Sequence, residues 1–396
     1  MQPKIWLCSS EHAGDLNNGL AIAKALSTNI RIIHTGAMGA GAFEMSKEED
    51  TIIVRFTNES LGESTYETVH RNDFPDVFIN SANHSFHQHL QGIRTDRIKY
   101  FGYLPEFKNT LFVHVNIPNG PIESHPQTHM EVVFRQQIKT ADQIQPNMHI
   151  YDTVPTRVNS QTLEAGKKEW KDELSAFEQN RPIYYVIMGE RLDDNKDFSL
   201  QDAMGLAANV EKAVKKTGGS VVLTTSPRTK HDKEVIAAFT GMLDPHIPFY
   251  CYDYHANAAQ NNPHLGLLAL ADNIIFTDDS MSMASDCIVT GRPVYVYERL
   301  PMHSRILLDK NKQGHDAYKQ NLLEKGFVLP MDQLANPVRA TGQEPVNSAR
   351  QIAEDIRAQL ALRKQQKLAP SLVNATGKHG FLSGIIKKAA GHIQRL

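Results

Sequence analysis

The chain has 396 residues, of which 41% are hydrophobic and 22% are charged, and its formal net charge is -2. This composition is typical of a globular protein and not of a disordered one, and the near-neutral charge gives no indication of nucleic-acid binding. The three cysteines, Cys8, Cys251 and Cys287, lack metal-ligand or redox spacing and are expected to be small buried residues of a reducing compartment. No apolar run is long enough for a signal peptide or a membrane-spanning helix. These features predict a cytoplasmic protein, or one that contacts a membrane only at its surface.

Short apolar runs alternate with polar segments over residues 1–160. Residues 4–9 are predicted to form a buried strand, followed by a polar loop with glycines and a helix at 20–26. Open α/β sheets place their sites at the carboxyl ends of strands, and glycines let the backbone approach a ligand. The alternation favours a mostly parallel sheet. The loop residues of interest are His12, Gly14, Asp15 and Asn17, and further strands are expected at 31–34, 51–55, 76–80, 99–103 and 111–115.

The same alternation restarts after a polar helical segment at 157–180, which is predicted to lead out of the first domain. A second run of strands and helices follows, with Gly189 at the end of its first strand. Two such runs predict two doubly wound Rossmann-like domains, residues 1–160 and 161–345, that face a cleft. The expected strands are 182–188, 220–225 and 249–254, and the expected helices are 200–217 and 265–271.

Residues 272–298 are predicted to form a strand, a polar turn, a helix, a glycine and a second strand. The helix is expected over about 281–290 and is closed by Gly291 and Pro293. Free backbone N–H groups at its start suit the phosphates of a nucleotide. An ordinary capped βαβ unit fits the spacing equally well.

The C-terminal residues have a different character. A helix is predicted at 346–365, with Pro370 ending it or its extension. The tail, 371–396, places apolar side chains on one helical face and only cations beside it, which is typical of a helix lying on an anionic membrane. A last helix packed on the body of the protein is the alternative. The membrane-facing candidates are Phe381, Leu382, Ile385, Ile386, Lys387 and Lys388.

Four motifs in the second half resemble the mitochondrial-fission Elm family. The family pattern is T-T-S-R-R-T, N-P-Y, T-x-D-S-x-S-M-x-S-E and T-G-K-P-V, and it is matched at residues 224–229, 262–264, 277–286 and 290–294. This chain departs from the pattern at Pro227, His264, Asp286 and Arg292. The resemblance spans about residues 4–330 and is specific in the second half. The family in turn looks like the GT-B glycosyltransferases.

This resemblance implies that the second domain holds the nucleotide diphosphate of an activated sugar. Asp286 would then bond the ribose hydroxyls, and Arg228 would meet the diphosphate with Lys230 as a second cation. The first domain would supply the base that takes the acceptor proton, and no metal or other cofactor is expected. The other implied binding residues are Gly189, Tyr252, Ser280 and Ser282, the candidate bases are Asp15, His12 and His84, and Gly14 and Asn17 would lie on the acceptor side.

The expected function is a metal-independent GT-B glycosyltransferase at the cytoplasmic membrane face, acting on a lipid-linked or cell-envelope glycan. Its expected partners are a nucleotide-sugar donor, a glycan or lipid-linked acceptor and an anionic membrane, with no nucleic acid. Two alternatives remain open at this point: a non-catalytic nucleotide-sugar-binding adaptor, and a nucleotide-sugar epimerase on the same fold.

Overall fold

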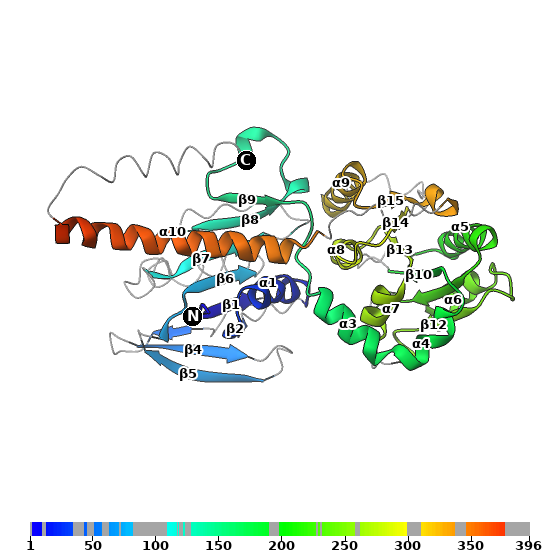
Figure 1. Cartoon of the computed structure of the whole chain (residues 1–396), viewed down its shortest axis with the longest axis horizontal. Coiled ribbons are helices and arrows are strands. Elements are labelled where there is room, and N and C mark those ends of the chain that lie inside the picture. The colour runs from blue at the N-terminus through cyan, green and yellow to red at the C-terminus, as the bar shows by residue number, and fades with distance from the viewer. Residues whose placement is uncertain are drawn as a thin grey trace.

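The computed structural model of the chain has two α/β domains, each built on its own sheet (Figure 1). It describes residues 2–9, 13–34, 43–45, 51–57, 63–70, 73–81, 109–116, 118, 122, 128–189, 198–226, 229, 232–257, 262–298, 310–336 and 346–376. The expected strand at 99–103 and the tail beyond 376 lie outside these residues. None of the helices in this described part combines the length and hydropathy that crossing a bilayer requires.

The N-terminal sheet has the strand order β3-β4-β2-β1-β6-β7-β8-β9, with β5 paired to β4. Within the run β2-β1-β6-β7-β8-β9 all neighbouring strands are parallel. β4 pairs antiparallel with β2, β3 and β5. The expected mostly parallel sheet is therefore present, with an antiparallel edge that the sequence pattern did not reveal. The strands are β1 (Ile5–Ser9), β2 (Ile30–His34), β3 (Phe43–Met45), β4 (Thr51–Thr57), β5 (Ser64–His70), β6 (Val77–Ser81), β7 (Leu111–Val115), β8 (Met130–Phe134) and β9 (Met148–Tyr151).

The second sheet has the order β12-β11-β10-β13-β14-β15, and all its described pairings are parallel. Alternate side chains of β10 enter different cores: Tyr185 joins the cluster with α7 and α8, whereas Tyr184 joins the cluster with α5 and α6. Helices therefore cover both faces, and the predicted α/β class with two doubly wound domains is confirmed. The strands are β10 (Ile183–Ile187), β11 (Ser220–Thr224), β12 (Phe249–Tyr252), β13 (Asn273–Thr277), β14 (Val294–Tyr297) and β15 (Leu329–Pro330).

The helices expected at 200–217, 265–271 and about 281–290 are present, whereas α6 and α9 were not predicted, and one expected helical segment is broken. The segment expected to be a single helical stretch is divided at Trp170, the C-cap of α3 and the N-cap of α4. The helices are α3 (Ser160–Glu169), α4 (Lys171–Glu178), α5 (Leu200–Thr217), α6 (Asp232–Thr240), α7 (His264–Leu270), α8 (Met281–Ile288) and α9 (Lys310–Glu324).

The chain passes between the domains twice, and the two crossings touch. The outgoing segment carries Thr153 and the returning segment carries Ser348, and their hydroxyl oxygens are 2.5 Å apart in a buried position. Next to them, Asn347 Nδ2 donates to the carbonyl oxygen of Val158 at 3.3 Å. Buried hydroxyl pairs of this kind fix two backbones to one another because neither group has water as a substitute partner.

The returning chain forms α10 (Ser348–Thr376), which completes the first domain. It packs on α1 (Ala13–Leu26), as Figure 1 shows, and buries Ile352, Ala353 and Ile356 in the core of the N-terminal sheet. The expected stop at Pro370 is wrong, since the helix continues to Thr376. A proline removes one hydrogen bond from a helix but does not necessarily end it.

A polar contact also holds α10 against the edge strand β9. The Asp355 carboxylate lies 3.3 Å from His149 Nδ1 and accepts a 2.5 Å hydrogen bond from the Tyr151 hydroxyl. The hydrogen bond from His149 lowers the pKa of Asp355, and that from Tyr151 adds to the effect. Of the three cysteines, Cys8 and Cys287 are buried as expected, whereas Cys251 is only half-buried.

We expect the replacement Ile352→Ala to lower the free energy of unfolding by about 2–5 kcal/mol, because it leaves a cavity between α10 and the N-terminal sheet. Urea denaturation followed by circular dichroism measures the change. Gln351→Ala is the matched control, since Gln351 is the exposed neighbour on the same helix and its loss should change stability by less than about 0.5 kcal/mol. Equal stability of the two variants would show that α10 is only loosely attached.

Candidate nucleotide-binding site

The order in which strands are added to the second sheet reverses between β10 and β13. From β10 the chain adds β11 and β12 on one side, and then returns to place β13 on the other side of β10. Open α/β sheets bind ligands outside the carboxyl ends of the strands at such a reversal. The segment that leaves β10 carries Gly189 as its second residue, and the segment that leaves β13 begins with Asp278.

A buried polar cluster fixes these two strand ends to each other. The Thr277 hydroxyl accepts from Gly189 N at 2.9 Å and donates to Asp279 Oδ1 at 2.5 Å. A Cβ atom on Gly189 would lie 2.2 Å from Asp279 Oδ2, so the carboxylate occupies the space that any other side chain would need. The sequence therefore requires glycine here because of a close approach and not because of a special backbone angle.

Two adjacent acids follow β13, and both are engaged by the protein. Asp279 is buried against Thr277, as described above. Asp278 lies 3.7 Å from Lys319 Nζ of α9, and the same ammonium is 3.1 Å from Glu298. The positive charge of Lys319 beside Asp278 and Glu298 reduces the repulsion between these acids and an anionic ligand. Acids in this turn repel a phosphate bound at the helix, and the contact with Lys319 partly offsets that repulsion.

Helix α8 begins next to the cluster. Ser280 is its N-cap, and the Ser280 hydroxyl accepts from Met283 N at 3.3 Å, which leaves the Ser280 side chain bound to its own helix. Ser282 is exposed in the first turn. The first turn of a helix presents backbone N–H groups that suit an anion. Gly291 follows the helix with φ 67°, the left-handed conformation expected of a residue that closes a helix.

Asp286, on the same helix, has a protein partner on each carboxylate oxygen. Thr156 donates its hydroxyl hydrogen to Oδ1, and His264 Nε2 lies 3.6 Å from Oδ2. His264 in turn contacts the Tyr185 hydroxyl through Nδ1 at 2.8 Å. Burial raises the pKa of Tyr185, so its hydroxyl stays protonated and forms a hydrogen bond with His264 Nδ1.

The preceding residue, Ser285, attaches α8 to the outgoing crossing. Val154 N donates to the Ser285 hydroxyl at 3.1 Å and lies 3.3 Å from the Tyr318 hydroxyl of α9. Burial raises the pKa of Tyr318 to about 12. One short helix therefore carries the candidate phosphate-facing turn at its start and the contacts with the interdomain segment near its end.

The T-T-S-x-x-T motif forms a self-bonded turn after β11. The Thr229 hydroxyl accepts from Ser226 N at 3.0 Å and donates to Met188 O at 3.3 Å, and both residues are buried. These bonds fix the two ends of the loop that contains the predicted Arg228. Tyr252, the predicted base-pocket residue, is buried at the end of β12, the edge strand of this sheet.

Three of the predicted first-domain residues lie on α1, and ten further predicted residues lie outside the described part of the chain. The polar loop expected before a helix at 20–26 is wrong, since α1 already begins at Ala13. Asn17 is exposed on this helix, and the backbones of Gly14 and Asp15 lie in its first turn. The predicted residues outside the described part are His12, His84, Arg228, Lys230, Phe381, Leu382, Ile385, Ile386, Lys387 and Lys388.

Sequence reasoning missed a buried polar row in the first domain. Asn80, His114 and Glu131 are register partners on β6, β7 and β8, and all three are buried. Asn80 Nδ2 lies 3.2 Å from His114 Nδ1. The available signal was a polar residue inside each otherwise apolar strand. The sequence also did not indicate the roles of Thr156, in the outgoing segment, and Thr277, at the end of β13. Thr156 is 130 residues from its partner Asp286, and the local pattern places Thr277 only in a turn.

Parallel strands, helices on both faces and a polar cluster at the reversal define a two-domain Rossmann-like protein. The family model described as mitochondrial fission ELM1 matches residues 122–360, more than half of the chain, and the chain belongs to that family. The Arabidopsis thaliana mitochondrial fission protein ELM1 is 26% identical over 52% of this chain and 44% of its own length. An uncharacterised protein of Rickettsia prowazekii, RP120, is 28% identical over 30% of this chain and 31% of its own. The chain thus matches less than half the length of either relative.

The solved structures with a similar fold include two proteins whose names refer to nucleotide sugars. UDP-GlcNAc 2-epimerase from Methanocaldococcus jannaschii has 13% identity and a TM-score of 0.46, covering 90% of this chain and 99% of that chain. A UDP-glucosyltransferase from Polygonum tinctorium has 9% identity and a TM-score of 0.44, covering 91% of this chain and 95% of that chain.

We expect Gly189→Ala to destabilise the protein by about 1–3 kcal/mol, because the new methyl group overlaps the Asp279 carboxylate. In an Asp279→Ala background the same change should cost less, since the overlapping group is gone. A double-mutant cycle measured by chemical denaturation gives this coupling. Additive effects of the two substitutions would mean that the Gly189 backbone and the Asp279 side chain do not compete for space.

Proposed function

We propose that this protein is a metal-independent glycosyltransferase of GT-B type that takes its sugar from a nucleotide diphosphate. The observation that carries the proposal is the reversal between β10 and β13, where Thr277 and Asp279 fix two strand ends beside the start of α8. Helix N–H groups at this place suit a diphosphate. Membership of the family and the motif at residues 277–286 support the same assignment.

Asp286 is the proposed partner of the ribose hydroxyls. Its two oxygens already contact Thr156 and His264, but each carboxylate oxygen accepts more than one hydrogen bond, and the side chain is 26% exposed. The protein contacts also hold the shorter aspartate side chain in one orientation where the family pattern has glutamate. Capacity for further hydrogen bonds and a fixed geometry are both properties that recognition of a sugar hydroxyl needs.

In the proposed reaction the acceptor hydroxyl attacks the anomeric carbon and the nucleotide diphosphate departs. Arg228, with Lys230, would stabilise the charge on the departing diphosphate. Asp15 or His12, or else His84, would take the acceptor proton. The acceptor would be a lipid-linked or envelope glycan, because the basic amphipathic sequence of the tail is of the kind that would hold the protein at the inner membrane face.

Titration calorimetry of the full chain with UDP-, GDP-, CMP- and ADP-sugars tests donor binding. We expect one nucleotide class to bind, Asp286→Asn to weaken it by about tenfold or more, and Asp286→Glu to retain it. Asp172→Asn, an exposed acid on α4 of the same domain, is the control and should bind like the parent. Failure of all four classes to bind would overturn the proposal. Binding and release of a free epimer without an acceptor would favour an epimerase, and binding without turnover an adaptor.

Sedimentation with liposomes tests the membrane contact of the tail. The full chain should sediment with vesicles containing phosphatidylglycerol and not with pure phosphatidylcholine, since the tail carries cations and no acid. Removal of residues 377–396, which leaves the described helix α10 intact, should abolish sedimentation. Lys387→Glu with Lys388→Glu should do the same. Equal sedimentation of the full and shortened chains would exclude the tail as the membrane contact.

A further inference from the structure

A pocket of about 280 Å³ lies in the first domain, at the amino ends of β1 and β2. The proposed donor site is at the carboxyl ends of strands in the other domain, so the two places share no residue. The pocket is lined by Lys4, Ile5, Trp6, Asn29, Arg31, Glu67, Thr68, Val69 and Asp73.

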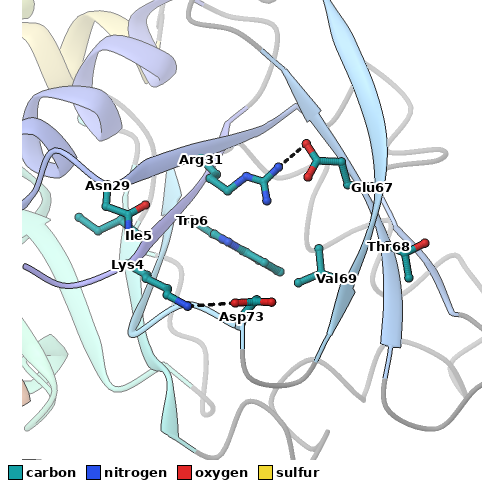
Figure 2. A pocket seen from close by; sticks show the side chains of 9 residues that line it. All are labelled: Lys4, Ile5, Trp6, Asn29, Arg31, Glu67, Thr68, Val69 and Asp73. Carbon is teal, nitrogen blue, oxygen red and sulfur yellow. Dashed lines mark hydrogen bonds and ion pairs between the residues drawn. The ribbon is translucent and has the colours of Figure 1, made fainter.

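β5, in the antiparallel part of the N-terminal sheet, contributes Glu67, Thr68 and Val69 to the lining of the pocket. Ile5 on β1 joins the core with α1 and α10, so its neighbour Trp6 lies on the opposite face, in register with Arg31 on β2. Glu67 and Val69, two residues apart on β5, both point towards this face in Figure 2. The antiparallel edge that the sequence pattern did not reveal is thus one wall of the pocket.

Two ion pairs flank Trp6. Arg31 pairs with Glu67 on one side of the ring, and Lys4 Nζ lies 3.3 Å from Asp73 Oδ1 on the other side (Figure 2). The four charged side chains are between 36% and 65% exposed. Ion pairs exposed to this degree stabilise a fold only marginally, so each charge can exchange its partner for a ligand group at little cost.

We propose that this pocket binds a small zwitterion of the amino-acid class. Among the described lining residues, two cations and two anions leave no net charge, so a lone anion meets Glu67 and Asp73, and a lone cation meets Lys4 and Arg31. A carboxylate next to an ammonium group satisfies both signs together. Trp6 and Val69 lie between the ion pairs and are almost fully buried, so a bound ligand would contact mainly the charged groups (Figure 2).

The volume agrees with this class of ligand. Pockets for drug-sized molecules start near about 300 Å³, and this pocket of about 280 Å³ is slightly smaller. A single amino acid has few enough atoms to enter, and it makes few contacts. Its binding is therefore expected in the millimolar to high-micromolar range.

Titration calorimetry of the full chain with L-leucine and L-glutamine tests the proposal. Two analogues of leucine carry one charge each: leucinamide lacks the carboxylate, and 4-methylpentanoate lacks the ammonium group. We expect at least one of the two amino acids to bind, and the single-charge analogues of leucine to bind about tenfold more weakly than leucine or not at all. Arg31→Gln and Glu67→Gln should each weaken amino-acid binding by about tenfold.

Arg350→Gln is the matched control, because Arg350 forms an exposed ion pair with Glu354 on α10, away from the pocket lining. It should leave amino-acid binding unchanged, and circular dichroism should show all three variants folded. Donor binding, measured with the nucleotide sugars, should be the same in every one of these variants. Absence of binding for both amino acids at about 20 mM, or equal binding by parent, Arg31→Gln and Glu67→Gln, would overturn the proposal.

Discussion

The buried hydrogen bond between Thr153 and Ser348 is the contact on which the arrangement of the chain depends. It joins two segments 195 residues apart at the one described place where the chain leaves the first domain and returns to it. Because α10 follows this point and fills the core of the N-terminal sheet, the first domain is complete only after the second has been made. The two domains are therefore joined by the chain itself, which passes between them twice, and by the packing of α10 on the first domain.

Helix α8 connects that crossing to the candidate site. Its first turn lies beside the Thr277–Asp279 cluster, whereas Ser285 and Asp286, near its last turn, contact the outgoing segment through Val154 and Thr156. A helix of eight residues is short and is hydrogen-bonded along its length, so its two ends cannot shift independently. A ligand bound at Asp286 would share a carboxylate with the interdomain segment, which links occupancy of the site to the position of that segment.

Charge is arranged differently in the two domains. In the second, Lys319 pairs with Asp278 and the Thr277 hydroxyl donates to Asp279, so both acids before α8 are bound by the protein. In the first, cations and anions remain paired and half-exposed around Trp6, which leaves a place that suits both signs. The two proposed sites thus differ in their charged groups and lie at opposite strand ends of their sheets.

Local sequence patterns determined the class of the protein and most of its second domain. The unit at 272–298 has its strand, capped helix and closing glycine within about two residues of the predicted bounds, since caps, prolines and apolar runs act over a few residues. Only the tertiary structure decided that β4 and β5 form an antiparallel edge, that α10 runs through Pro370 onto α1, and that Asp286 contacts Thr156 and His264. Most of these contacts join residues far apart in the chain, and their energy comes from burial against partners that no local pattern specifies.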